Sequence, residues 1–201
     1  MTVSISIFVA ALLVAVLILF HRATAVRTKQ TWEELARLVD GTFVPAGGPW
    51  SQPTPPMVEC TVQGLDVVVD SYVASIGRAS LVHTRARLQV PTLADRTVKI
   101  SREGLLASVG KLFGTQDVQV GEARYDDGFL IKASDPEWLR QHLDEAFRER
   151  HLQRPSVLIV LEDGQLSAVR LGIEHDPQRL REQVDLVVAC AQAFTGPPPA
   201  A

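Results

Sequence analysis

The chain has 201 residues, 46% of them hydrophobic, and its formal net charge at pH 7 is −3. A chain of this length can form one domain with a proper core. Its slightly acidic balance offers no strongly basic surface, so we expect no nucleic-acid partner. The two cysteines, Cys60 and Cys190, lie far apart in apolar contexts, and we interpret both as reduced core residues.

Residues 3–20 form an apolar run that only Ser4 and Ser6 interrupt. As a helix this run is roughly 27 Å long, close to the hydrocarbon thickness of a bilayer. It therefore predicts a single-pass transmembrane anchor over residues 1–26, with the membrane as a partner. The first positive charges, beginning at Arg22, follow the run. The positive-inside rule then places the C-terminal domain on the cytoplasmic side of the inner membrane.

A cleaved signal peptide is the alternative, because residues 23–25 form a small-x-small triplet of the kind that signal peptidase accepts. The missing positive charge before the run and the length of the run both argue against cleavage. Beyond the anchor we expect one domain over residues 27–195 and a disordered tail over residues 196–201. Two subdomains, at about 27–100 and 101–195, are the alternative division.

Strand signals and amphipathic helix signals alternate along the rest of the chain. The predicted strands are 57–63, 65–73, 80–90, 98–101, 117–120 and 129–133, followed by a hairpin around Asp163-Gly164; the predicted helices are 31–40, 105–113, 136–151 and 177–195. This order predicts an α+β fold: an N-terminal transmembrane helix, then one domain with an antiparallel sheet and amphipathic helices packed on the sheet.

The clearest predicted strand, residues 80–90, carries a basic stripe. His83, Arg85 and Arg87 alternate with apolar residues, so a strand places all three on one face. Asp66 and Asp70 share a face of the preceding strand and can pair with the stripe if the two strands are neighbours. We favour this structural pairing. The alternative is an anion-binding or lipid-headgroup site at His83, Arg85 and Arg87.

A pattern in the centre of the chain resembles that of bacterial membrane-anchored proteins of unknown function. An acidic residue and a glycine (Asp117 and Gly121) precede the aromatic-acidic pair Tyr125-Asp126, and Phe129 follows before a helix start at 134–135. In those proteins a Phe takes the place of Tyr125, and a Gly is common where Ser134 stands. The resemblance spans roughly residues 117–150 and implies an anchored domain of uncharacterised role, without any catalytic or binding residue.

Other candidate site residues have ordinary structural explanations. His142, Glu145, Glu149 and His151 can share or adjoin one helix face, but any exposed helix face produces such polar spacing. The adjacent carboxylates Asp126-Asp127 precede a glycine and are typical of a turn. We therefore predict no catalytic residue, no metal site and no cofactor, and we regard an enzyme as the less favoured class.

The function that this sequence predicts is a non-enzymatic module that binds a protein partner through a sheet edge or a groove. The first alternative is a sensor of an anionic ligand or lipid headgroup that uses the basic stripe. The second alternative is an unrecognised hydrolase. A deep pocket with converging polar groups favours either alternative, whereas an apolar patch or an open strand edge favours the interaction module.

Overall fold

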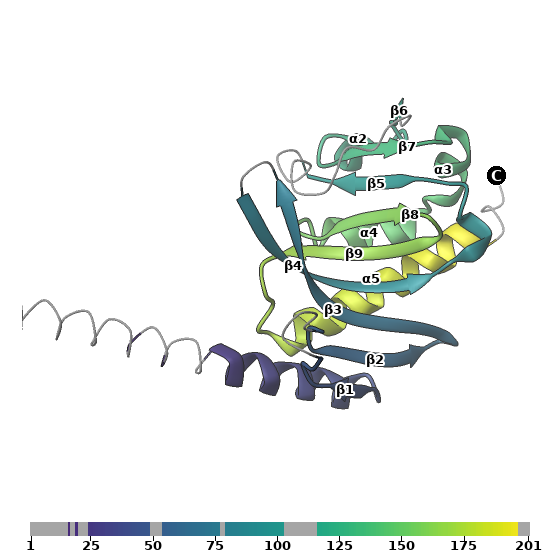
Figure 1. Ribbon diagram of the computed structural model, residues 1–201. Helices are drawn as coiled ribbons and strands as arrows, with labels where there is room; N and C mark the ends of the chain where they lie inside the picture. Colours follow the sequence, from purple (N-terminus) through teal and green to yellow (C-terminus); the bar gives the residue numbers. More distant parts are fainter. Residues whose placement is uncertain are drawn as a thin grey trace, which may run out of the picture.

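A computed structural model of the chain describes residues 16, 19, 24–48, 54–76, 79–102 and 116–196. An N-terminal helix over residues 24–38 comes first (Figure 1). The strands are β1 Thr42–Val44, β2 Met57–Val62, β3 Leu65–Ile76, β4 Ala79–Gln89, β5 Val98–Ser101, β6 Gln116–Asp117, β7 Leu130–Ala133, β8 Leu158–Glu162 and β9 Gln165–Leu171. The later helices are α2 Ala123–Asp126, α3 Pro136–His142, α4 Glu145–Leu152 and α5 Pro177–Thr195, and a 3-10 turn spans Pro91–Leu93.

The described strands form one antiparallel sheet in the order β1-β2-β3-β4-β9-β8-β5-β7-β6. The sequence-adjacent strands β2, β3 and β4 pair with one another as meanders, and β8 pairs with β9 as a hairpin. Asp163 and Gly164 turn that last hairpin with φ values of +50° and +72°, which is the left-handed backbone that a tight two-residue turn requires. The predicted α+β class and antiparallel sheet are therefore confirmed.

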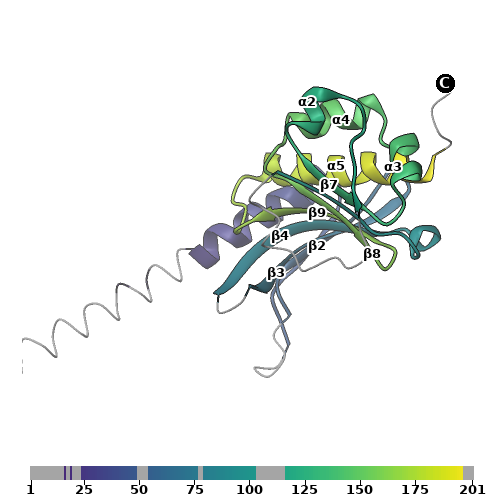
Figure 2. The same cartoon turned by 90° about the horizontal axis from the view of Figure 1, so that it is seen from above.

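The helices cover one face of this sheet (Figure 2). Helix α5 crosses β4 and β9, and the apolar side of this amphipathic helix is buried from Leu180 to Phe194. Asp176 accepts hydrogen bonds from the first backbone N–H groups of α5, which is ordinary N-capping. Within the sheet contact, the buried Gln183 side chain donates to the carbonyls of Thr84 (3.1 Å) and Ala168 (2.6 Å), which fixes α5 against β4 and β9.

The N-terminal helix packs beside α5 and begins earlier than the sequence predicts. The predicted start at Thr31 is wrong, because the helix is continuous through that residue and the Thr31 hydroxyl donates to the carbonyl of His175. Trp32 and Leu35 are fully buried in the main core. Arg181 of α5 donates to the carbonyl of Leu38 near the end of this helix. One hydrogen bond therefore joins the N-terminal helix to α5, and a second joins it to His175 in the segment just before α5.

The predicted helix 136–151 is two helices. The Asp144 side chain accepts a hydrogen bond from the backbone N–H of Phe147, so Asp144 is the N-cap of α4. The chain turns at Leu143, whose φ and ψ of −85° and +75° end α3. Leu143 is fully buried at this junction.

The predicted transmembrane helix is wrong for the part of the chain that the structure describes. None of the helices described there is long and apolar enough to cross a membrane. The described N-terminal helix, residues 24–38, carries charged residues along its length and buries only one face, which is the pattern of an amphipathic helix. Of residues 3–20, only Val16 and Leu19 are described. The predicted helix 105–113 and the tail after Gly196 also lie outside the described residues.

Candidate functional site

The candidate site lies on the face of the sheet opposite the helices. Side chains alternate between the two faces along β4, so Ala86 and Leu88 face the main core while Arg85 and Arg87 face the other way. Three apolar residues of β8 and β9 form a small second cluster on this face, packed against Tyr72: Leu158, Val160 and Val169. We call the surface formed by Tyr72, Arg85, Arg87, Val160 and Val169 the Tyr72 face.

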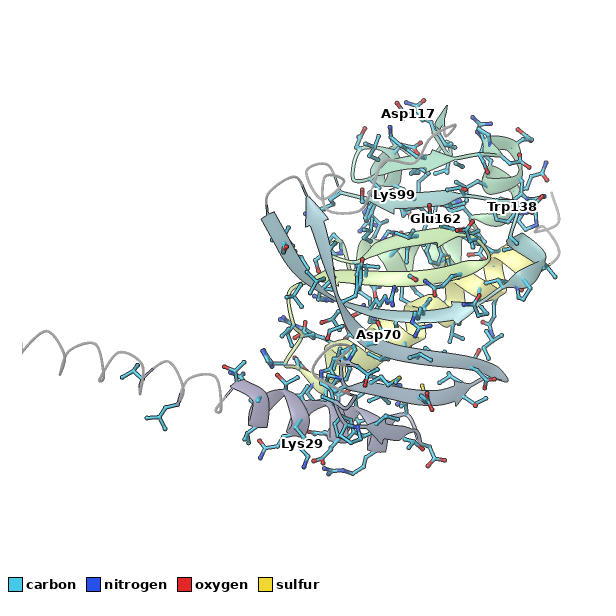
Figure 3. The ribbon with its side chains drawn as sticks, viewed as in Figure 1. Lys29, Asp70, Lys99, Asp117, Trp138 and Glu162 are labelled. Atoms are coloured by element: carbon cyan, nitrogen blue, oxygen red, sulfur yellow. The ribbon has the colours of Figure 1, made fainter. Side chains whose placement is uncertain are left out.

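Two arginines share one carboxylate on the Tyr72 face. Arg85 donates from Nε to Oδ1 of Asp70 at 2.6 Å and from Nη2 to Oδ2 at 3.1 Å. Arg87 donates from Nε to Oδ2 of the same carboxylate at 2.9 Å. Asp66, the other candidate partner, instead accepts a hydrogen bond from Thr61. The cluster of two guanidinium groups and one carboxylate therefore keeps a formal charge of +1 (Figure 3 labels Asp70).

Tyr72 is held between His83 and Arg85. The Tyr72 and His83 rings stack with centroids 5.3 Å apart, and the Arg85 guanidinium carbon lies 4.5 Å from the Tyr72 ring centroid, a cation–π geometry. Burial raises the pKa of the Tyr72 hydroxyl, and the nearby Arg85 opposes that rise. The phenol therefore stays neutral at physiological pH.

His83 differs from the two arginines of the predicted stripe. Its side chain is 1% exposed, and among the described residues neither ring nitrogen has a hydrogen-bond partner. Burial lowers the pKa of His83, which favours the neutral ring. His83 therefore supports the Tyr72 ring and adds no positive charge at neutral pH. Anion binding at His83, Arg85 and Arg87 stays a prediction.

Tyr72 lines two separate hollows. The first, which we call the sheet hollow, has a volume of about 430 Å³ and a mixed polar and apolar lining: Tyr72, Arg85, Gln89, Val160, Glu162, Asp163, Gln165, Ser167 and Val169. The second, which we call the edge hollow, has a volume of about 500 Å³ and a mainly apolar lining: Ala46, Thr54, Pro55, Ser71, Tyr72, Val73 and Val82. The sequence did not single out Tyr72, although it alternates in phase with Asp70 along the same strand.

The edge hollow lies beside the part of β3 that extends beyond the end of β2. Pairing between β2 and β3 ends at Met57 and Asp70, whereas β3 continues to Ile76 paired with β4. Among the described residues, no strand pairs with the outer edge of β3 beyond Asp70. Val73 and Val82 are register partners on this projecting ribbon and are 62% and 37% exposed. The ribbon therefore presents an open strand edge beside exposed apolar side chains.

Lys99 and Glu162 occupy the far side of the same face (Figure 3). Lys99 of β5 is 2% exposed, and burial lowers the pKa of its ammonium group. The Glu162 carboxylate, on β8, opposes that shift. Glu162 thus favours the charged form of Lys99, and it also lines the sheet hollow with Arg85.

The other candidate residues of the sequence have structural roles. Asp126 accepts hydrogen bonds from the N–H groups of Val120 and Gly121 and so clamps a loop. His151 is not on an exposed face with His142, because it is fully buried. Among the described residues, no group of three or more His, Cys, Asp or Glu side chains converges on a point that could hold a metal ion.

His151 instead forms a buried network with Tyr125. The Tyr125 hydroxyl lies 2.7 Å from Nδ1 of His151, and Nε2 of His151 lies 2.8 Å from the carbonyl oxygen of Val157. A carbonyl only accepts, so Nε2 carries the proton and Nδ1 accepts from Tyr125. Phe129 stacks on the imidazole at 4.3 Å between centroids. Burial lowers the pKa of His151 to about 4, so the ring is neutral.

Comparison with known proteins finds a shared fold. The sequence matches no protein-family model and no curated protein. The crystal structure of the mycobacterial trehalose monomycolate transport factor A, TtfA, is similar to this chain, with a TM-score of 0.59 over 87% of this chain and 98% of TtfA. The two sequences are 11% identical, so the likeness concerns the fold alone. The resemblance to uncharacterised membrane-anchored proteins stays a prediction.

Proposed function

We propose that this domain is a protein-interaction module that binds an extended segment of a partner along the open edge of β3. The observation that carries the proposal is the length of β3, which continues past the end of β2 at Asp70 with its outer edge unpaired among the described residues. An exposed strand edge offers backbone N–H and C=O groups to an incoming strand. Strand addition there would continue the sheet in the place of β2.

The surroundings of the edge supply pockets for side chains of the added strand. Alternate residues of an added strand face opposite sides of the sheet. On one side they would meet Tyr72, and on the other side Val73 and the edge hollow. The outermost strands of the sheet offer less, because β1 has three residues and β6 has two. Short edge strands are a common protection against unwanted pairing.

Site-specific photocrosslinking in cells tests this proposal. A photoreactive amino acid replaces Val73 in one version of the full-length chain. In the matched control it replaces Val26, a valine of similar exposure on the N-terminal helix. We expect a discrete crosslinked partner from position 73, absent from position 26 and lost when Tyr72→Ala is added. Identical adducts from both positions, or adducts that survive Tyr72→Ala, would contradict strand addition at β3.

A further inference from the structure

The cluster of Arg85, Arg87 and Asp70 on the Tyr72 face keeps a formal charge of +1. Asp70 is the carboxylate bonded to Arg85 and Arg87, and both of its oxygens are occupied by their donors. Among the described residues, Nη1 of Arg85 and both Nη groups of Arg87 donate no hydrogen bond to the protein. The two arginine side chains are 24% and 27% exposed, so their remaining N–H groups are partly shielded and still accessible. Such donors favour an anionic group.

An apolar hollow begins on the other side of Tyr72. The Arg85 guanidinium lies over the Tyr72 ring, and the same ring lines the edge hollow with Val73, Val82 and Pro55. The edge hollow, at about 500 Å³, is large enough for an alkyl chain. The Tyr72 ring thus has the Arg85 guanidinium on one side and the apolar edge hollow on the other. Two other carboxylates, Glu162 and Asp163, line the sheet hollow, but among the described residues the ion pairs of Arg85 and Arg87 are with Asp70 alone.

From this juxtaposition we propose that the Tyr72 face binds an anionic amphiphile, with its charged head on Arg85 and Arg87 and its alkyl chain across Tyr72 in the edge hollow. The head is a carboxylate or a phosphate, since both accept from guanidinium donors. Bound there, the chain occupies the space that an added strand would use beside β3. Binding of the ligand and binding of the protein partner would therefore be mutually exclusive. The proposed ligand site does not depend on whether the domain has a protein partner.

The test titrates the full-length chain with dodecanoate and dodecyl phosphate below their micellar concentrations and measures affinity by calorimetry. Acetate supplies a head without a chain, and dodecyl maltoside supplies a chain without a charge. We expect both anionic amphiphiles to bind, with acetate and dodecyl maltoside at least about tenfold weaker, because apolar burial and charge-assisted hydrogen bonds each contribute. Binding of only one anionic head identifies the headgroup class.

Charge variants separate a binding role from a structural one. Arg85→Gln or Arg87→Gln leaves a neutral cluster and should weaken dodecanoate binding about tenfold. Asp70→Asn raises the cluster charge to +2 and should strengthen it, a direction that structural damage would not produce. The control Arg124→Gln changes an arginine that is 68% exposed elsewhere on the surface and should leave affinity unchanged.

A photoreactive diazirine at the end of the dodecanoate chain locates the bound ligand. Mass spectrometry should place the adducts at Pro55 or Val73, and Val73→Thr should reduce them while Val26→Thr does not. The proposal is overturned if affinity is the same in Arg85→Gln, Asp70→Asn and the unmodified chain, if dodecyl maltoside binds as tightly as dodecanoate, or if adducts form only outside the edge hollow. Crosslinking of a protein partner at position 73 is a separate result, so either proposal can fail alone.

Discussion

The buried pair of Tyr125 and His151 makes the stability of the domain depend on pH. The pKa of His151 falls from 6.5 to about 4 on folding because the ring is buried. Between pH 6.5 and about 4, His151 is therefore largely protonated in the unfolded chain and largely neutral in the folded chain. The free energy of unfolding decreases as the pH falls through this range. The loss is complete below about pH 4, where both states are protonated.

The size of this loss follows from the two pKa values. Between pH 7.5 and pH 5, His151 alone should lower the free energy of unfolding by about 2 kcal/mol, since one pKa unit corresponds to about 1.4 kcal/mol. Burial also lowers the pKa of His83, which acts in the same direction. The contribution of His151 is therefore the difference between the unmodified chain and His151→Gln.

Urea denaturation of the full-length chain at several pH values measures that difference. The curve of unfolding free energy against pH should be flatter in His151→Gln by about 2 kcal/mol over this range. Tyr125→Phe keeps the imidazole and removes the hydroxyl donor, so it should lower stability at neutral pH while keeping a steep dependence. Parallel curves for the unmodified chain and His151→Gln would show that the imidazole is not held neutral, and the reasoning would be refuted.

Three further changes test the packing and the caps by chemical denaturation. Leu143→Ala should lower the free energy of unfolding by about 2–5 kcal/mol because Leu143 is fully buried. The neighbouring change His142→Ala should alter the free energy of unfolding by about 0.5 kcal/mol or less. Equal losses in the two variants would mean that the α3–α4 junction is misplaced. Gln183→Leu should cost about 1–3 kcal/mol because two sheet carbonyls lose their donor, and Gln178→Ala, on the exposed side of α5, is its matched control. Asp176→Ala should cost about 1 kcal/mol through loss of the α5 cap, and no change would contradict the capping bonds.

Short sequence patterns correctly predicted the turns and helices that depend on residues close together in the chain. The Asp163-Gly164 hairpin and the helix over 177–195 are both confirmed, because a tight turn and an amphipathic helix need only short-range information. The sequence also placed Arg85 and Asp70 on facing strands, and the register pairs them directly. Their spacing along a hairpin made that contact predictable.

Long-range contacts determined what the sequence did not predict. The periodicity predicts one helix over residues 136–151, but in the fold Asp144 caps a separate helix, α4, and Arg148 forms an ion pair with Glu122. His83 resembles an exposed member of a basic stripe, yet it is buried, with its ring stacked on Tyr72 and a backbone bridge to Gly172 of a distant segment. The strand order is likewise not local, since β5 pairs with β7 and β8 and not with β4.

The strand order also determines when the sheet can be completed during synthesis. The hairpin β8–β9, residues 158–171, lies between β4 and β5, although it is made after both. Until that hairpin leaves the ribosome, β4 and β5 each lack a neighbour, and the two halves of the sheet have no strand to join them. Nascent chains with unpaired edges are prone to misassembly. A chain truncated before Leu158 would therefore lose the centre of its sheet, and a chaperone that shields strand edges would act on this protein late in translation.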